Sequence, residues 1–185
     1  MGERPTLVTR RLVLRPFTLE DAPDVQRLAG DRDVAAGMGN MPYPYEDGMA
    51  EEWILAQQAG FEKGEQVNFA ITHRDQSFLI GSIGLFMERQ HQRANLGYWV
   101  GKPYWNQGFG TEAARAVVRY GFETLGLNRI QAGYFKSNPA SGRVIQKIGM
   151  SYEGCLREHV NKWGQLKDVV ICGMLRSEYH TAGTG

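Results

Sequence analysis

Apolar and polar positions follow two regular spacings along the chain, and each spacing predicts one kind of element. Where they alternate, every second side chain faces the same side, as in a strand buried on one face. Where apolar residues recur every three or four positions, they form one face of a helix. The predicted elements are, in order, a strand at Leu7–Phe17, a helix that starts at Thr18, an irregular loop at residues 30–48, a helix at residues 53–61, strands at Asn68–His73, Phe78–Glu88 and Asn95–Gly101, a helix at Gly108–Leu125, a strand at Arg129–Phe135, a short helix at Asn138–Lys147, and a hairpin of Tyr152–Asn161 with Leu166–Leu175.

The order of these elements predicts the fold class. Consecutive strands form a meander in the middle of the chain, whereas two later helices connect strands as crossovers. This combination predicts an α/β or α+β fold with a mixed sheet, not a regular doubly wound sheet. No internal repeat or low-complexity linker divides the chain, so we expect residues 1–180 to form a single domain, with a flexible tail at residues 181–185.

Composition and charge narrow the classes of function. A chain of 185 residues suits one domain with room for a ligand cleft. The formal net charge of +1 provides no basic field, so neither nucleic acid nor a membrane is an expected partner. The N-terminus lacks the apolar core of a signal peptide, and no apolar run has the length of a membrane span. Cys155 and Cys172 lack CxxC spacing, which favours buried thiols in a reduced, cytoplasmic setting and predicts no disulfide and no metal site.

Residues 96–113 form the segment with the clearest chemical signal. A predicted strand ends near Gly101, and after a short loop Gly108 and Gly110 lead into a helix with one apolar face. The first N–H groups of a helix have no partner within it, and the helix dipole adds partial positive charge there. Glycine lets the backbone approach an anion closely. The segment is therefore predicted to hold a phosphate group.

Two other interpretations of this pattern remain open. A glycine-lined helix start without any ligand is common. Gly108, Gly110 and Ala113 also satisfy the dinucleotide fingerprint G-x-G-x-x-G/A. However, the strand ends well before Gly108, and the next strand ends in two aromatic residues and a lysine (134–136) where an acidic residue should meet a ribose. A Walker-type loop is excluded because no Gly-Lys-Ser/Thr sequence follows the glycines.

Three short stretches resemble the GNAT N-acetyltransferase superfamily: Gly-Tyr-Trp at 97–99, Tyr-Trp-Asn-Gln-Gly at 104–108 and Thr-Glu-Ala at 111–113. The similarity runs from about Leu7 to Tyr179 and is closest to the ribosomal-protein N-terminal acetyltransferases of RimJ/RimL type. It implies a GNAT-like, mostly antiparallel twisted sheet flanked by helices, and acetyl-CoA as co-substrate. One departure is plain, since the family's cofactor loop has the form Q/R-x-x-G-x-G/A and this chain has Trp105 at the Q/R position.

The resemblance also implies the residues of a cofactor site. Loop amides would hold the pyrophosphate, and the strand edge at 99–101 would pair with the pantetheine arm. A second match, N-x-x-[AS] leading to K-x-G-[FM] at residues 138–150, implies a ligand of the pantetheine or thioester region and a phosphate contact. Asparagine and proline at the start and glycine past the end also describe ordinary helix punctuation. The implied cofactor-binding residues are Trp99, Val100, Gln107, Gly108, Phe109, Gly110, Thr111, Asn138 and Arg143.

Acetyl transfer from a thioester needs a polarised carbonyl, a neutral amine and a proton for the departing thiolate. A strand amide near Val100 is expected to donate a hydrogen bond to the thioester carbonyl and so polarise it. The family's acidic tyrosine is replaced here by Ile145. The resemblance therefore implies that Ser141, with Asn138 beside it, donates a proton or a hydrogen bond to the thiolate sulfur. The alternative is that Ser141 only bonds to the helix backbone. For the base we select Glu158, with Glu88, a bound water or no base at all as alternatives.

Glu158 is selected because of two positions at which related sequences carry a carboxylate. This chain has Asn95 and Val160 there, and Glu158 shares the face of Val160 if the strand is regular.

The expected function is therefore transfer of an acetyl group from acetyl-CoA to a primary amine by direct attack in a ternary complex. The resemblance favours the α-amine of a protein or peptide N-terminus. A small amine such as an antibiotic or polyamine, a non-catalytic acyl-CoA-binding module and a dinucleotide-binding oxidoreductase are the alternatives. The sequence leaves open whether the protein forms a homodimer.

Overall fold

The strands of the protein form one mixed sheet in the computed structural model, which describes residues 3–182. Within these residues the sheet has eight strands in the order β1-β2-β3-β4-β5-β6-β8-β7. Neighbouring strands run antiparallel except β5 and β6, which run parallel. The predicted mixed, mostly antiparallel sheet with flanking helices is confirmed.

The elements follow one another largely as the residue pattern predicts. The strands are β1 (Leu7–Val8), β2 (Leu12–Arg15), β3 (Gln66–His73), β4 (Leu79–Glu88), β5 (Arg93–Val100), β6 (Arg129–Phe135), β7 (Ser151–Lys162) and β8 (Gln165–Leu175). The helices are α1 (Ala22–Ala29), α2 (Arg32–Ala36), α3 (Met49–Glu62), α4 (Phe109–Glu123), α5 (Pro139–Lys147) and α6 (Arg176–Ala182). In the described part of the chain, no helix combines the length and apolar character needed to cross a membrane.

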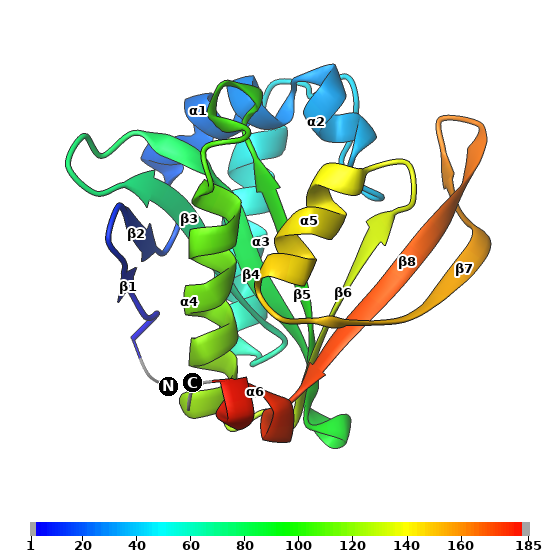
Figure 1. Ribbon diagram of the computed structural model, residues 1–185. Helices are drawn as coiled ribbons and strands as arrows, with labels where there is room; N and C mark the ends of the chain where they lie inside the picture. Colours follow the sequence, from blue (N-terminus) through cyan, green and yellow to red (C-terminus); the bar gives the residue numbers. More distant parts are fainter. Residues whose placement is uncertain (1–2, 183–185) are drawn as a thin grey trace.

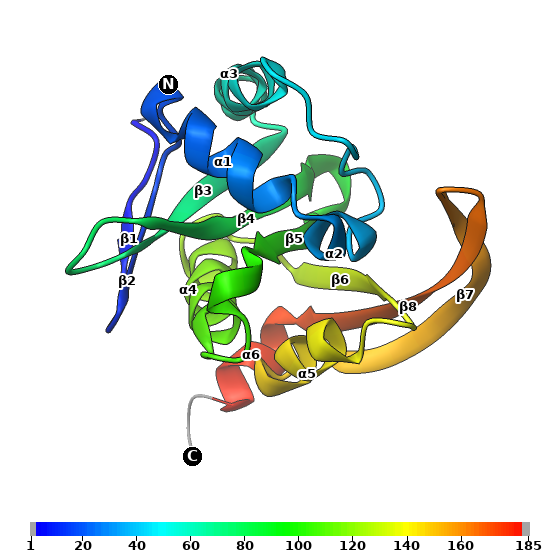
Figure 2. The ribbon, with the colours of Figure 1, turned by 90° about the horizontal axis from the view of Figure 1, so that it is seen from above.

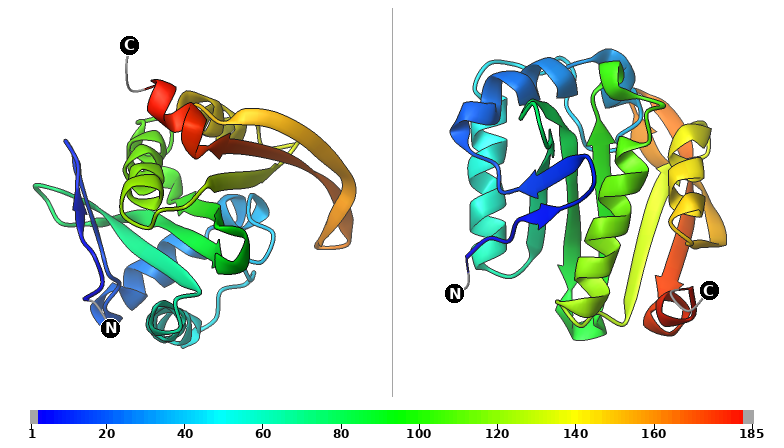
Figure 3. Two further views of the ribbon diagram at one scale, coloured as in Figure 1. Left: turned by 90° about the horizontal axis from the view of Figure 1, so that it is seen from below. Right: turned by 60° about the vertical axis from the view of Figure 1, so that its left-hand side comes forward.

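Helices cover both faces of the sheet. α1, α2 and α3 lie on one face, and α4 and α5 lie on the other, as the views from the side and from above show (Figures 1 and 2). Each face has its own apolar core, because side chains of a strand alternate between the two sides. On β5, Leu96 is buried in the core beneath α4, whereas Trp99 is buried in the core beneath α1 and α3. β7 and β8 form a long hairpin that extends beyond both layers (Figure 3).

Three details differ from the sequence-based expectations. The single strand predicted at Leu7–Phe17 is two strands, because the chain reverses between Val8 and Leu12 and pairs β1 with β2. The loop predicted at residues 30–48 contains α2, whose N-cap Asp31 accepts a hydrogen bond from the amide of Asp33. Helix α6 extends to Ala182, so the first two residues of the predicted tail are helical; residues 183–185 lie outside the described residues.

Candidate functional site

The two central strands diverge and open the sheet beneath α5. β5 and β6 pair in parallel only from Arg93↔Arg129 to Leu96↔Ala132. Beyond this point β5 continues to Val100 beside β4, and β6 continues to Phe135 beside β8. Neighbouring strands normally satisfy each other's backbone groups. The end of β5 therefore presents backbone donors and acceptors on the side that faces β6.

Strand alternation identifies which groups of β5 face this gap. The amide of Gly101 donates to the carbonyl of Ile80 in β4 at 2.8 Å. In an antiparallel ladder such bonds recur at every second residue, so Trp99 also faces β4 with its backbone. Tyr98 and Val100 then direct their N–H and C=O groups towards β6. The side chain of Trp99 is also buried against α1 and α3, so its contact with the cofactor stays a prediction.

The loop before α4 has the backbone conformation of a phosphate cradle. Gly108 is the N-cap of α4 and has φ of +79°, a left-handed conformation that favours glycine. A Cβ atom added there would have only the Nη2 atom of Arg11 within 4 Å, at 3.4 Å, so the face of the loop is open. Gly110 packs closely on β5, with the side chains of Val100 and Tyr98 at 3.5 and 3.6 Å from its Cβ position. The first turn of α4 thus lies directly beside the opened sheet, as a diphosphate followed by an extended arm requires.

The side chains of the loop have separate structural tasks. Phe109 is buried, whereas Gln107 and Trp105 are exposed and bond to nearby carbonyl groups. The indole of Trp105 donates to the carbonyl of Val100 at 2.7 Å. The residue at the family's Q/R position therefore ties the loop to β5. Backbone amides at residues 107–111 remain the predicted phosphate ligands, and Thr111 is half-buried among them.

A tyrosine that the motif analysis did not select reaches the predicted catalytic serine. The hydroxyl oxygens of Tyr98 on β5 and Ser141 on α5 are 2.9 Å apart, and either can donate. Burial raises the pKa of Tyr98 above its ordinary value, while the bond to Ser141 opposes this shift in part. The phenol consequently keeps its proton at neutral pH. The sequence signal was the even-numbered position of Tyr98 between Leu96 and Val100, which places its side chain on the face of α4 and α5.

The start of α5 is held by Asn138, as the punctuation pattern predicts. Its Oδ1 atom accepts a hydrogen bond from the amide of Ser141 at 3.3 Å. Its Nδ2 atom lies 3.1 Å from the Cβ position of Gly37, in the loop that follows α2. Asn138 therefore stands between the first turn of α5 and that loop. Arg143 lies further along α5 and is exposed, so its contact with a phosphate stays a prediction.

The other wall of this region is the β7–β8 hairpin. Val160 lies 3.9 Å from the Cβ position of Gly39, and the Nζ atom of Lys162 donates to the carbonyl of Met41 at 2.8 Å. Lys162 is buried, and this burial lowers its pKa. The rings of Tyr43 and Trp163 complete the contact, with centroids 5.4 Å apart. Lys162 is therefore a buried cation between the hairpin and the loop after α2.

The strand argument for Glu158 does not hold across the hairpin. The register between β7 and β8 shifts between Leu156 and Val160, which marks a bulge. Glu158 has φ of +50°, and its amide donates to the carboxylate of Asp168 at 3.0 Å. Because alternation is interrupted there, a shared face with Val160 no longer follows. Glu158 is exposed, and its role as a base stays a prediction.

Glu88 is connected to the position where related sequences carry a carboxylate. Its Oε1 atom accepts from the Nδ2 atom of Asn95 at 3.1 Å, and Gln131 donates to Asn95 at 2.7 Å. The guanidinium of Arg93 lies 2.7 Å from the other carboxylate oxygen and lowers the pKa of Glu88. A lowered pKa makes this carboxylate a weaker base. Asn95 and Gln131 thus place two bonded amides on β5 and β6, and the carboxylate connected to them belongs to Glu88.

Comparison with known proteins identifies the family that this arrangement represents. The model of the acetyltransferase (GNAT) domain matches residues 11–151. The uncharacterized N-acetyltransferases YoaA of Bacillus subtilis and p20 of Bacillus licheniformis are 33% and 32% identical over 175 residues, which cover 93% and 94% of this chain and 97% and 98% of theirs. The [ribosomal protein uS5]-alanine N-acetyltransferase of Escherichia coli is 25% identical over 120 residues, or 64% of this chain and 62% of its own.

Solved structures share the same fold over nearly the whole chain. A GNAT-family acetyltransferase from Bacillus anthracis has a TM-score of 0.83 at 25% identity and covers 94% of this chain and 99% of its own. RimL, a ribosomal L7/L12 α-N-protein acetyltransferase in complex with CoA, has a TM-score of 0.85 at 16% identity, with 92% and 98% covered. Spermidine N-acetyltransferase from Vibrio cholerae, with CoA and spermine, has a TM-score of 0.81 at 22% identity, with 93% and 99% covered.

Proposed function

Because this chain belongs to the GNAT acetyltransferase family and is an acetyl-CoA-dependent N-acetyltransferase, we propose that its acceptor is the α-amine of a protein or peptide N-terminus. The observation that carries this proposal is that Asn95 and Gln131 bond to each other across β5 and β6, while Glu88, the carboxylate bonded to Asn95, is paired with Arg93 and is therefore a weak base. An α-amine has a pKa near 8, whereas an alkyl amine has a pKa near 10. An N-terminal amine therefore loses its proton to water or a weak base far more readily.

We place the entrance of the acceptor beside the β7–β8 hairpin, where the local charge supports the same choice. Lys162 is buried between the hairpin and the loop after α2, where its bonded partner is the carbonyl of Met41. A polyamine carries several positive charges and would be repelled by this cation, since like charges close together in a poorly solvated site are costly. A peptide N-terminus carries one charge, which it must lose before reaction. Two of the similar proteins are named as ribosomal-protein acetyltransferases, one for an alanine of uS5 and one for the α-amine of L7/L12.

For the reaction we propose direct attack of the neutral amine on the thioester carbonyl. The amide of Val100 faces the gap between β5 and β6 and would donate to the carbonyl oxygen as negative charge develops there. As the new C–N bond forms and the C–S bond breaks, the thiolate takes a proton from Ser141, Ser141 takes one from Tyr98, and Tyr98 takes one from water. The proton released by the amine passes to water. This relay would replace the acidic tyrosine that the family places where this chain has Ile145.

A substrate panel tests the acceptor directly. We would measure CoA thiol release with acetyl-CoA and peptides beginning with alanine, serine, threonine or methionine, with spermidine, and with an aminoglycoside, and locate the acetyl group by mass spectrometry. Matched peptides with a blocked N-terminus and one internal lysine separate α-amine from side-chain acetylation. We expect the highest kcat/KM for a free N-terminus. A preference for spermidine or the aminoglycoside would refute the acceptor assignment.

The remaining alternatives are separated by ligand binding. Thermal stabilisation by acetyl-CoA, with none by NAD or NADP, is expected, because a ligand that binds the folded state raises its melting temperature. Stabilisation by acetyl-CoA without turnover on any amine would favour a non-catalytic binding module. The cytoplasmic setting stays a prediction that rests on the two thiols, of which Cys172 is buried and Cys155 half-buried.

A further inference from the structure

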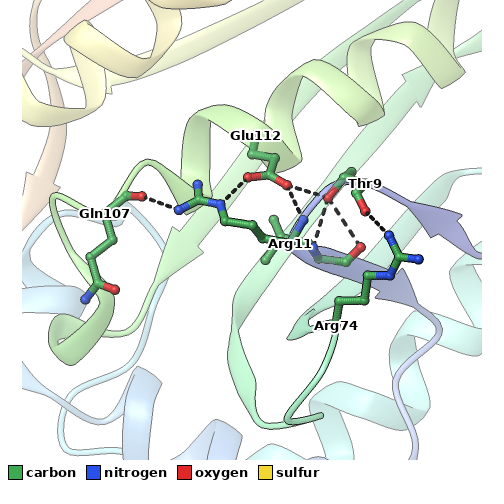
Figure 4. Close-up of polar contacts among 6 residues, drawn as sticks. Thr9, Arg11, Arg74, Gln107 and Glu112 are labelled. Carbon is green, nitrogen blue, oxygen red and sulfur yellow. Dashed lines mark hydrogen bonds and ion pairs between the residues drawn. The ribbon is translucent and has the colours of Figure 1, made fainter.

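A charged cluster joins the N-terminal hairpin to the head of α4. The guanidinium of Arg11 extends over the loop that precedes the helix, and Glu112 of the first helical turn meets it (Figure 4). The Nε atom of Arg11 lies 2.7 Å from one oxygen of Glu112, and its Nη1 atom donates to the carbonyl of Gln107 at 2.9 Å. Residues about a hundred positions apart are thereby fixed together at the predicted phosphate loop.

Arg11 contacts Gln107 and Phe109 of this loop and lies beside Gly108 between them. In addition to Gln107, its Nη2 atom lies 3.4 Å from the Cβ position of Gly108, and its guanidinium carbon lies 4.5 Å from the ring centroid of Phe109. The ring of Phe109 is buried and gives the guanidinium a fixed surface to stack on. The cation is therefore held against the loop by stacking on Phe109 and by hydrogen bonds to Glu112 and to the carbonyl of Gln107.

Glu112 places a negative charge in the first turn of α4, beside the predicted phosphate site. Burial alone would raise its pKa, but hydrogen bonds from the Thr9 hydroxyl and from the amide and side chain of Arg11 outweigh burial and lower the pKa below its ordinary value. The carboxylate is consequently ionised at neutral pH. A negative charge in the first turn suits the helix dipole, but it repels a diphosphate that seeks the same N–H groups. Its oxygens are instead occupied by Thr9 and Arg11, at 2.7 to 2.8 Å.

We infer that Arg11 is a positioning residue for the diphosphate of acetyl-CoA. It neutralises Glu112 and holds the carbonyl of Gln107, so that the loop presents N–H groups and no negative group to the phosphates. The family's loop has a glutamine or arginine where this chain has Trp105, and here the cation comes from the N-terminal hairpin. The inference rests on the proposed binding of CoA at residues 107–111.

Paired ligands with and without phosphates provide the test. Arg11→Met removes the charge and keeps the apolar stem over Phe109. We expect its Kd for CoA, measured by calorimetry, to rise about tenfold or more, because charge-assisted bonds are lost at the loop. The kcat/KM for S-acetylpantetheine, which lacks every phosphate, should stay within roughly twofold of wild type, a result that general loosening of the fold would not produce.

A second substitution separates neutralisation from direct phosphate contact. If Arg11 acts by neutralising Glu112, then Arg11→Met combined with Glu112→Gln should recover most of the CoA affinity, to within roughly threefold of wild type. A double variant as weak as Arg11→Met would overturn the inference, because the loss would then come from a lost direct contact with phosphate. Equal losses for CoA and S-acetylpantetheine would also overturn it.

Two further variants keep the test decisive. Arg74→Met is the matched control, because Arg74 donates to the carbonyl of Thr9 at 3.3 Å in the same cluster but belongs to the β3–β4 connection. It should leave CoA affinity unchanged, and a loss equal to that of Arg11→Met would contradict the inference. If Arg11→Met fails to fold, Arg11→Lys keeps the charge that neutralises Glu112 and should hold CoA affinity to within roughly threefold of wild type; a loss of about tenfold in that variant would overturn neutralisation as the role of Arg11. Lack of CoA binding by the wild-type protein would instead refute the loop assignment itself.

Discussion

Gly108→Ala separates the two physical roles that glycine has at the head of α4. The residue has φ of +79°, and an L residue in the left-handed region costs about 1–2 kcal/mol. In a domain of this size such a loss lowers Tm by roughly 2–8 °C. The added methyl group itself meets only the end of the Arg11 side chain, at 3.4 Å, so no steric cost within the protein is expected.

The same methyl group stands on the open face of the loop, where a phosphate must approach. Losing one charge-assisted hydrogen bond between an amide and a phosphate costs about 1.5–3 kcal/mol. This corresponds to a loss of roughly 10- to 150-fold in affinity for acetyl-CoA. Calorimetric titration of Gly108→Ala with acetyl-CoA measures this loss, and differential scanning calorimetry measures the change in Tm.

Gly48→Ala is the matched control for backbone strain. Gly48 is also an N-cap with left-handed φ, at +87°, and a Cβ atom added there would meet nothing within 4 Å. It begins α3 instead of α4. Both variants should lose similar stability, but only Gly108→Ala should lose affinity for acetyl-CoA. Wild-type affinity in Gly108→Ala, or equal losses in both variants, would refute the placement of the phosphate at this loop.

Three further predictions concern the proton relay, the start of α5 and the acid limit of stability. Tyr98→Phe keeps the ring and removes the hydroxyl that meets Ser141, so kcat should fall on the order of 10²-fold with little change in KM, and an unchanged kcat in steady-state assays would exclude the relay. Asn138→Ala should weaken acetyl-CoA binding and cost about 1 kcal/mol as a lost N-cap; a loss of stability alone, with unchanged Kd, would return Asn138 to a capping role. Because its partners hold the pKa of Glu112 below 4.5, its contribution to stability is complete above that pH and is lost as the pH falls through the lower folded-state value. Glu112→Gln should therefore flatten the decline of Tm below pH 4.5, and a decline as steep as in wild type would contradict this.

The local sequence was sufficient to predict the glycine-lined start of α4 and the helices around it. Glycine at 108 and 110, followed by apolar residues at helical spacing, predicts a helix start with free N–H groups because both signals are local. The same holds for α5, where Asn138 caps the helix that the punctuation predicts. The sequence pattern predicts β1 and β2 as one strand because the signal that separates them is not local. Their shared apolar pattern continues through the turn, and only pairing between the two strands shows that the chain reverses.

Glu158, the residue predicted as the base, shows how a local rule fails when tertiary structure interrupts it. The face predicted for Glu158 followed from period-two alternation, which a bulge between Leu156 and Val160 breaks. Bulges depend on the partner strand, and here the carboxylate of Asp168 in β8 accepts a hydrogen bond from the amide of Glu158. A single strand read along its own residues contains no information about this contact.

The sequence by itself determined the kind of elements, their order and the loop that suits a diphosphate, because periodicity, glycine conformation and helix ends act over a few residues. Only the tertiary structure decided which distant side chains meet in the site. The divergence of β5 from β6 brings Tyr98 to Ser141, and the N-terminal hairpin brings Arg11 to Glu112 across about a hundred residues. Such contacts depend on how the layers pack, and packing is a property of the whole chain.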